Sequence, residues 1–305
     1  MFEKAEMLYI YVETPLHAGS GSSVGVVDLP IQRERVTNYP LVQASGIKGK
    51  LRAEAADVLK RENDADAAKK VAVVFGPKNS DHAGALSPGD ARLLLFPVRS
   101  LVGVFAWATS NNVLARLKRD LASAGKTVPW TIGDPPGNGE TLTVDDKSIV
   151  ASGSVVLEEF AFKATSQGWV KTVAEWLAAN AFPQTDDYKY FREKVQTSLV
   201  ILHEDAFRDF TQFSTEVVTR IRIDQTTKTA AKQKLWSEEH LPSDTLLYAP
   251  MHASRPRTDN TPNGLKTADD VLKVVRDLNL DRIQLGGDET VGRGIVKLHF
   301  GGGQS

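Results

Sequence analysis

The fold of this chain is decided by residues 7–52, which read MLYIYVETPLHAGSGSSVGVVDLPIQRERVTNYPLVQASGIKGKLR. Residues 7–13 alternate between two faces, with Leu8, Ile10 and Val12 on one of them, which is typical of a β-strand. Pro15 ends this strand, and residues 15–44 carry Gly, Ser and Pro without a helical period. Ser45 is predicted to cap a helix over residues 46–62. A loop this long in a compact domain is usually functional.

Strand and helix patterns alternate through the rest of the chain. Residues 91–109 predict a strand, a bend at Pro97 and a second strand, and residues 154–164 predict another strand. Helical patterns occupy residues 112–124, 168–180, 188–199 and 267–278, and short strands are expected at RIQLG and GIVKLHF near the end. This interleaving favours an α+β domain over a helical bundle or a β-sandwich.

Two segments are predicted to leave the body of the domain. Residues 215–224 (TEVVTRIRID) alternate, and with the polar turn and the strands after them they predict a long β-hairpin. At its base we expect four apolar side chains to pack, namely Ile221, Ile223, Leu235 and Trp236. Residues 133–146 (GDPPGNGETLTVDD) are rich in turn residues and predict an exposed, flexible insertion.

Composition excludes several classes of protein. The chain has 305 residues, which is enough for one large domain or two small ones, and its formal charge is −1. With no cysteine, it cannot form disulfides, thiolate zinc sites or iron–sulfur clusters, and a reducing cytoplasm fits. The N-terminus carries charges at Glu3, Lys4, Glu6 and Glu13, and no run reaches the ~20 apolar residues of a membrane span. We therefore expect a cytoplasmic protein without a membrane partner.

Charge is distributed unevenly along the chain. Residues 30–52 hold five basic residues against one acidic residue, and residues 217–234 do the same, so each run carries +4. Such islands are typical of nucleic-acid contacts, although each alone is more often a solvated face.

The common catalytic motifs are absent. GSGSSVG at 19–25 has Val24 where a dinucleotide fingerprint needs its third glycine, and Leu51 stands where a phosphate loop needs Ser or Thr. No Gly-x-Ser-x-Gly sequence occurs, and the six histidines never share a metal-ligand spacing. The sequence therefore shows neither a serine hydrolase nor a zinc enzyme.

Three separated stretches resemble one known family. They are residues 14–52 within the opening quotation, residues 220–248 (RIRIDQTTKTAAKQKLWSEEHLPSDTLLY) and residues 285–300 (LGGDETVGRGIVKLHF). Together they resemble the RAMP superfamily of CRISPR-associated RNA-binding proteins, specifically the backbone subunits of type III-B (Cmr) effector complexes. The resemblance implies a modified RRM-like, ferredoxin-type palm with a projecting β-hairpin thumb and inserted loops.

The resemblance also implies a domain plan and partners. One RAMP domain would span residues 1–305, with the palm at about 1–132, 147–210 and 250–305, the thumb at about 215–248, and a flexible insertion at about 133–146. The expected partners are a CRISPR guide RNA, target RNA, further copies of the chain stacked head-to-tail, and other subunits of the complex.

Three groups of residues are predicted to contact RNA. The helix N-terminus with Ser45, Lys48, Lys50 and Arg52 is suited to phosphates, with a plain basic helix face as the alternative. The glycines at 285–294 are implied to lie against the RNA backbone, although a tight turn would equally explain them. The third group comprises Arg293 near these glycines and the basic residues of the thumb, which would displace a base. The complete set of predicted RNA-binding residues is Ser45, Lys48, Lys50, Arg52, Arg220, Arg222, Lys228, Gly286, Gly287, Gly292, Arg293 and Gly294.

Asp28 is the candidate catalytic residue. Taken alone, an isolated loop aspartate is most often a turn former. The resemblance implies instead that Asp28 in VVDLP is the metal-dependent cleavage residue, holding a divalent cation such as Mg²⁺ or Mn²⁺, or positioning the 2′-hydroxyl of the target. His17, Glu238 and His240 are candidate auxiliaries, with unrelated surface roles as the alternative.

These residues leave three functions to compare. The first is a backbone subunit that cleaves guide-paired target RNA at displaced nucleotides. The second is a purely architectural subunit that coats the guide without catalysis. The third, a stand-alone nuclease that processes the guide precursor, lacks the histidine pair that would support it.

Overall fold

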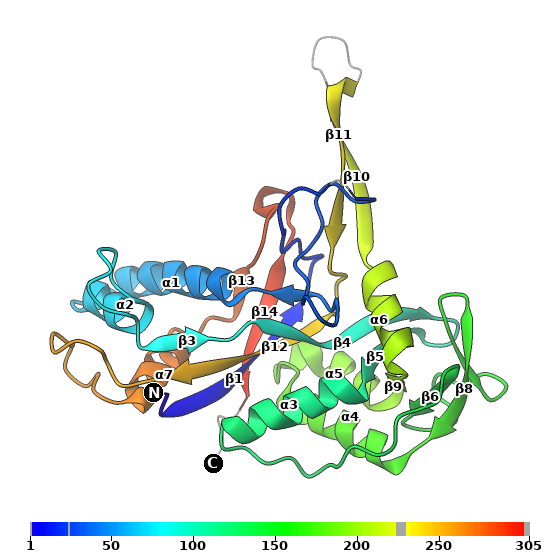
Figure 1. Cartoon of the computed structure of the whole chain (residues 1–305). Helices are drawn as coiled ribbons and strands as arrows, with labels where there is room; N and C mark the ends of the chain where they lie inside the picture. Colours follow the sequence, from blue (N-terminus) through cyan, green and yellow to red (C-terminus); the bar gives the residue numbers. More distant parts are fainter. Residues whose placement is uncertain (1, 24, 224–229, 302–305) are drawn as a thin grey trace.

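A computed structural model describes residues 2–23, 25–223 and 230–301 and has the α+β architecture that the sequence predicts (Figure 1). Its helices are α1 (Ala44–Arg61), α2 (Ala67–Phe75), α3 (Asn111–Ser123), α4 (Gly168–Asn180), α5 (Lys189–Ser198), α6 (Glu204–Phe213) and α7 (Ala268–Asp277). Its strands are β1 (Lys4–Val12), β2 (Leu41–Val42), β3 (Leu86–Pro88), β4 (Ala91–Ser100), β5 (Val104–Ser110), β6 (Glu140–Thr143), β7 (Ser154–Leu157), β8 (Phe160–Ser166), β9 (Leu199–Leu202), β10 (Glu216–Ile223), β11 (Ala230–His240), β12 (Leu246–Ala253), β13 (Arg282–Gln284) and β14 (Ile295–Gly301).

One large sheet forms the body of the protein. Its strands follow the order β13-β14-β1-β12-β4-β5-β9-β6-β8-β7, with β2 paired to β4 and β3 paired to β12. Helix α7 packs on β1 and β12, and α3 packs on β4 and β5. None of the helices within the described residues is both long and apolar enough to cross a bilayer.

The core is centred on β1, the strand predicted at residues 7–13. It lies between β12 and β14, antiparallel to both, and every side chain from Met7 to Val12 is at most 2% exposed. Both faces of the strand are therefore covered, and each fully buried Leu or Ile contributes about 1.5–3 kcal/mol. This confirms the strand and places the loop that follows it at the end of a rigid element.

The hairpin β10–β11 forms a sheet of its own and projects from the body, and we call it the thumb (Figure 1). The hairpin ends at His240, earlier than the predicted range of 215–248. The residues from Leu246 onward belong to β12, which pairs with β1 in the large sheet. Ile221 and Leu235 are 51% and 65% exposed, so the predicted packing of these two side chains is wrong. A two-stranded ribbon with no layer over this face cannot bury them.

Three local predictions also differ from the structure. Helix α1 begins at Ala44 after Gln43, and Ser45 lies inside its first turn; the Ala44 amide donates instead to Asp90 Oδ1 at 2.8 Å. Strand β4 continues through Pro97, and the chain reverses at Gly103, whose φ of +77° suits glycine. Within 133–146, Glu140–Thr143 forms β6, whose last three side chains are buried, so that part is not an exposed insertion.

Candidate functional site

The loop of residues 13–40 carries Asp28 and lies along the edge of β11. The Leu29 amide donates to the Ser237 carbonyl at 3.0 Å, and the Glu239 amide donates to the Leu29 carbonyl at 3.0 Å. Leu16 and Leu241 form a further bridge nearer the body. The loop is therefore attached to the base of the thumb by backbone hydrogen bonds, which fixes the position of Asp28.

Asp28 is exposed and is held by a single residue. Its Oδ2 accepts hydrogen bonds from the Ser237 amide at 2.8 Å and from the Ser237 hydroxyl at 2.9 Å. These two bonds lower the pKa of the Asp28 carboxyl below its usual range, and the bond from the Ser237 amide has the larger effect. Because both bonds use Oδ2, the charged group can still reach a ligand through Oδ1.

Glu239 of β11 holds the same loop through its buried carboxylate. This carboxylate is 5% exposed and accepts hydrogen bonds from Arg33 Nη2 at 2.5 Å, the Ile31 amide at 3.0 Å and the Thr215 hydroxyl at 2.8 Å. Arg33 also donates to the carbonyls of Asn38 and of Thr211. A buried charge with this many donors holds its surroundings in one geometry.

His17 belongs to this loop and lies beside the end of β11. Its Nδ1 is 2.7 Å from the Glu239 carbonyl, and since a carbonyl only accepts, Nδ1 carries the proton and Nε2 keeps a lone pair when the ring is neutral. The His17 and His240 rings are 5.4 Å apart, and the Gly287 amide donates to the His17 carbonyl. His17 therefore joins the first loop to both the thumb and the C-terminal glycines.

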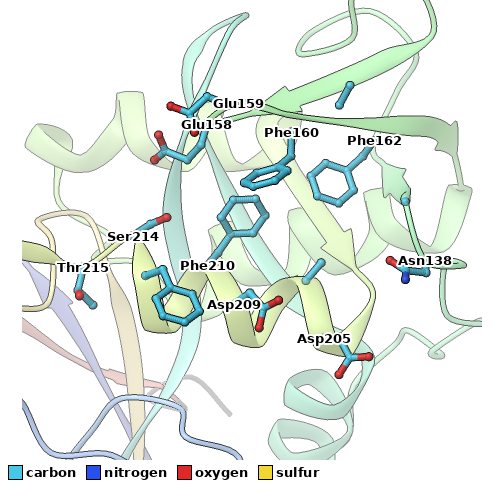
Figure 2. Close-up of a pocket in the computed structure, with 14 residues that line it drawn as sticks. Asn138, Glu158, Glu159, Phe160, Phe162, Asp205, Asp209, Phe210, Ser214 and Thr215 are labelled. Carbon is cyan, nitrogen blue, oxygen red and sulfur yellow. The ribbon is translucent and has the colours of Figure 1, made fainter. Parts of the chain in front are cut away.

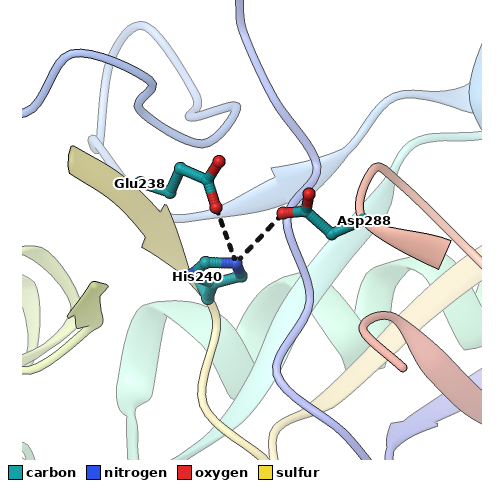
Figure 3. Close-up of side chains that lie close together, drawn as sticks. All are labelled: Glu238, His240 and Asp288. Carbon is teal, nitrogen blue, oxygen red and sulfur yellow. Dashed lines mark ion pairs between the residues drawn. The ribbon is translucent and has the colours of Figure 1, made fainter. Parts of the chain in front are cut away.

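Behind β11, Glu238, His240 and Asp288 converge (Figure 3). His240 Nε2 lies 3.9 Å from Glu238 Oε2 and 3.5 Å from Asp288 Oδ2. Arg220 from β10 pairs with Glu238 through Nε and lies 3.3 Å from Asp288 through Nη2. Burial, followed by the charges of the nearby Arg293 and His17, lowers the pKa of His240. Of the three predicted auxiliaries, Glu238 and His240 thus meet directly, and His17 lies beside them.

The basic residues of α1 divide into two groups. Lys48 and Arg52 share one face with Arg257, and burial followed by the charges of Arg257 and Arg52 lowers the pKa of Lys48. Lys50 points to another face and pairs with Glu54 at 2.8 Å. The predicted phosphate contacts therefore form two separate positive sites rather than one.

The predicted anion site at the start of α1 is largely satisfied by the protein itself. The Ala44 amide donates to Asp90, and the Gly46 and Ile47 amides both donate to the Gln43 carbonyl. Fewer free amides remain for a phosphate than a helix N-terminus ordinarily offers. Contacts with RNA at this end would therefore depend mainly on side chains.

The C-terminal glycines form a turn that packs against the first loop. A Cβ at Gly286 would lie 2.2 Å from the His17 carbonyl oxygen, and one at Gly294 would lie 1.9 Å from the Leu285 carbonyl oxygen. Both residues also have positive φ, so turn geometry alone requires glycine there. Around Gly292 the space is open, and Arg293 lies 3.8 Å from Glu216 of the thumb.

A hollow of about 600 Å³ joins the start of α1 to this turn. Ser45, Lys50 and Gly286 are among its lining residues, which also include Gly19, Gly46, Gly49 and Gly287. Two groups that are far apart in the sequence, and that were predicted separately to contact RNA, therefore face one groove. Its glycine-rich walls let a backbone approach closely.

The predicted basic residues of the thumb have different environments. Arg220 is engaged by Glu238 and Asp288, so it is not a free contact for RNA. Arg222 is exposed, and Lys228 lies outside the described residues.

A larger hollow, of about 860 Å³, lies elsewhere, between β8 and α6 (Figure 2). Phe210 contacts Phe160 and Phe162 with ring centroids 6.2 and 5.9 Å apart. Four carboxylates stand at its rim, from Glu158, Glu159, Asp205 and Asp209. Arg99 pairs with Glu158 and Glu159, and Arg208 pairs with Asp205 and Asp209, so these groups together keep a charge of −2, which disfavours an RNA backbone.

With this geometry in place, the chain can be compared with known proteins. The model of the RAMP superfamily matches residues 9–297. The chain belongs to the RAMP superfamily. It is 39% identical over 304 residues to the CRISPR system Cmr endoribonuclease Cmr4 of Pyrococcus furiosus, covering 97% of this chain and 95% of that protein. It is 28% identical over 310 residues to the CRISPR system CMR subunit Cmr4 of Saccharolobus solfataricus, covering 96% and 95%.

Solved structures of other proteins share the fold. The crystal structure of oligomeric Cmr4 from Pyrococcus furiosus is 31% identical, with a TM-score of 0.72 and 99% of each chain covered. The cryo-EM structure of the type III-B Cmr-beta in its apo state is 25% identical, with a TM-score of 0.71 and 97% of each chain covered.

Four residues of this RAMP chain join the site only in the structure, namely Ser237, Glu239, Arg257 and Asp288. Ser237 and Glu239 belong to the polar run SEEH at 237–240, and an acidic pair followed by histidine inside a strand was a usable signal. Asp288 and Arg257 carry no comparable signal, because each reaches its partners only through the tertiary fold.

Proposed function

We propose that this chain is the RNA-binding backbone subunit of a type III-B CRISPR effector complex, and that it cleaves target RNA paired with the guide. The 39% identical relative is named an endoribonuclease of the Cmr system, and the 25% identical structure is a type III-B complex. The observation that carries the proposal is Asp28, an exposed carboxylate with a lowered pKa held at the base of a projecting thumb. A purely architectural subunit would have no need of such a group.

The proposed domain plan follows the same comparison. We assign β1, β12, β14 and the helices packed on them to an RRM-like palm, over about residues 1–132, 147–210 and 246–305, with β10 and β11 (Glu216–Ile223 and Ala230–His240) as the thumb. RAMP membership and the antiparallel pairing of β1 with β12 and β14 support this assignment. We place the protein in the cytoplasm, where a cysteine-free chain needs no oxidising environment.

The guide RNA is proposed to run through the groove between α1 and the glycine turn. Lys50, Ser45 and the open Gly292 would meet its backbone, and the Lys48–Arg52–Arg257 face would carry the adjoining phosphates. Such contacts position RNA without reading its sequence, which is left to base pairing. Exposed Arg222 on the thumb would meet the duplex at the displaced nucleotide.

Asp28 would act on the target strand where the thumb separates a nucleotide from its neighbours. Its charged carboxylate can orient the 2′-hydroxyl or accept its proton, and the 2′-oxygen then attacks the adjacent phosphorus. The bond from phosphorus to the 5′-oxygen of the next nucleotide breaks, and a water molecule protonates that oxygen. The products are a 2′,3′-cyclic phosphate and a 5′-hydroxyl. The residues fit a hard divalent cation, since Mg²⁺ is commonly held by one carboxylate together with water and RNA oxygens, and it would supply charge stabilisation at the phosphate.

Self-assembly is proposed to use the apolar surface beside the thumb. Phe213 and Phe160 are 75% and 60% exposed at the aromatic hollow, and Val217, Ile221 and Leu235 are exposed on the thumb. Another copy of the chain, stacked head-to-tail, would cover this surface, as fits an oligomeric relative. Mass measurement with guide RNA tests this proposal: Phe213→Ser should reduce assembly size, and unchanged assembly would place the contact elsewhere.

The decisive experiment compares complexes assembled with wild-type, Asp28→Asn or Asp146→Asn chains on complementary RNA with Mg²⁺. Asp146 is an exposed aspartate outside the site and serves as the matched control. Asp28→Asn should abolish cleavage while guide and target binding persist, because an exposed substitution changes stability by less than about 0.5 kcal/mol. A 2′-deoxy nucleotide at the cut position should block that cut. Full cleavage by Asp28→Asn complexes would leave the architectural function as the better account.

A further inference from the structure

The cluster behind β11 contains more buried polar atoms than it satisfies. Glu238 is 5% exposed and His240 is fully buried. Within the part of the chain that the structure describes, neither ring nitrogen of His240 has a hydrogen-bond partner, and the nearest charge to Asp288 Oδ2 is Arg220 Nη2 at 3.3 Å, in an ion pair without hydrogen-bond geometry. Buried imidazoles and carboxylates are ordinarily hydrogen-bonded, so an unsatisfied set of this kind calls for a ligand.

The unsatisfied atoms face one another rather than pointing in different directions. Figure 3 shows the Glu238 and Asp288 carboxylates turned toward the same side of the His240 ring, each joined to Nε2 by a dashed line. One ligand atom from each residue lies within 4.8 Å of the others. The distances of 3.9 and 3.5 Å from His240 Nε2 to the two carboxylate oxygens are short enough for one divalent cation to bond all three atoms at about 2.0–2.6 Å.

We propose that Glu238, His240 and Asp288 form a divalent-cation site, best suited to Mn²⁺. Two carboxylates favour hard cations such as Mg²⁺ and Mn²⁺, while an imidazole nitrogen favours transition metals, so the donor set selects a metal that accepts both. The three ligands occupy only part of an octahedron and leave positions for water or an RNA oxygen.

Arg293 lies near His240, and Arg220 is the positive charge that pairs with the two carboxylates. Its guanidinium pairs with both carboxylates, and its side chain retains 23% exposure, which gives it a route toward solvent. A cation entering between Glu238 and Asp288 would displace it, because both compete for the same oxygens. Removing Arg220 should therefore strengthen cation binding, which is the opposite of what loss of an ordinary structural residue produces.

The site connects two parts of the RNA surface. Glu238 and His240 come from the thumb strand β11, whereas Asp288 comes from the glycine turn. A bound cation would link the thumb to that turn more rigidly than a single arginine can. This inference does not depend on Asp28, which shares no described contact with the three ligands and is held by Ser237.

The test is Mn²⁺ titration of the full-length, RNA-free chain, followed by electron paramagnetic resonance of free Mn²⁺ and by the thermal unfolding midpoint. Wild-type chain should bind Mn²⁺, Asp288→Asn should bind it at least about tenfold more weakly, and Asp28→Asn should bind it normally. Arg220→Met should bind Mn²⁺ more tightly than wild type, and Mn²⁺ should raise its unfolding midpoint more than that of wild type.

The outcomes separate this site from the catalytic proposal. Loss of Mn²⁺ binding in Asp28→Asn but not in Asp288→Asn would overturn the inference and place the metal at Asp28. No binding in either wild type or Arg220→Met would also overturn it, leaving the cluster as an ion-pair network. If Asp288→Asn is poorly folded, Glu238→Gln replaces it, with the same tenfold weakening expected. Loss of cleavage in Asp28→Asn with intact Mn²⁺ binding would support both proposals together.

Discussion

Replacing Arg33 tests whether the buried Arg33–Glu239 pair positions Asp28. The two side chains are 14% and 7% exposed, and Glu239 would keep only the Ile31 amide and the Thr215 hydroxyl as donors in Arg33→Met. Removing one partner of a buried pair costs about 3–5 kcal/mol, and the two remaining donors place the expected loss near 3 kcal/mol. Glu239→Gln should cost less, about 1–3 kcal/mol, because Arg33 keeps two carbonyl acceptors.

Urea unfolding of the free chain measures these changes in stability, and the double variant measures the coupling. The double variant should be more stable than the sum of the single effects predicts, by more than about 1.5 kcal/mol, since either change removes the same interaction. Arg99→Met is the matched control: Arg99 pairs with Glu158 at the surface, is 65% exposed, and should cost less than about 1 kcal/mol.

The same variants report on function. Loosening the Arg33 anchor frees the loop next to Ile31, three residues from Asp28, so target cleavage should slow by about tenfold or more through misplacement of the carboxylate. Guide affinity should fall less than the cleavage rate, because the variant leaves the basic side chains of α1 in place, although Gln32 beside Arg33 lines the groove. Additive effects within about 0.5 kcal/mol would refute the coupling, and wild-type cleavage by Arg33→Met complexes would refute the positioning role.

Two further predictions concern charge. The triple variant Lys48→Ala, Arg52→Ala and Arg257→Ala should weaken guide binding for every guide sequence. The slope of the logarithm of the binding constant against the logarithm of salt concentration should fall by about 0.7–0.9 for each phosphate that the variant no longer neutralises. An unchanged slope in salt titrations would mean that these three residues form an ordinary solvated face. Ser237→Ala removes the hydroxyl bond that helps to lower the pKa of Asp28 and keeps the amide bond, so this pKa should rise partway toward its usual value. The acid limb of the pH profile of cleavage should then move to higher pH. An unmoved acid limb in single-turnover assays would mean that Asp28 does not determine it.

Local pattern was sufficient where burial and periodicity coincide. Helix α4 occupies the predicted residues 168–180, and α7 begins after Thr267, whose capping box with Asp270 is visible in the sequence. Predictions failed where a tertiary partner replaced a local one. Ser45 does not cap α1 because Asp90, from a distant loop, bonds the first amide of that helix, and Pro97 is tolerated inside β4.

The site was predictable residue by residue but not as an arrangement. Asp28, His17, Glu238 and His240 were all named from the sequence, yet the grouping of Glu238 and His240 with Asp288 depends on a turn almost fifty residues away in the chain. Likewise, the helical period predicts that Lys48 and Lys50 lie on different faces of α1. Arg257 lies near Lys48 only because of the tertiary fold, which brings its loop next to that face of the helix. Long-range pairing of this kind has no signature in a single sequence.

Strand β11 explains how one short run serves two sites. Side chains alternate along a strand, so Ser237 and Glu239 face one way and Glu238 and His240 face the other. The first pair holds the Asp28 loop, through Asp28 itself and through Ile31 and Arg33, while the second pair meets Asp288 of the glycine turn. A one-residue shift of register in the thumb would exchange the two sets and disrupt both sites at once. The buried Glu239, His240 and Leu241 oppose such a shift, because it would expose them or leave their partners unpaired, and so the base of the thumb must stay rigid even where its outer faces are exposed.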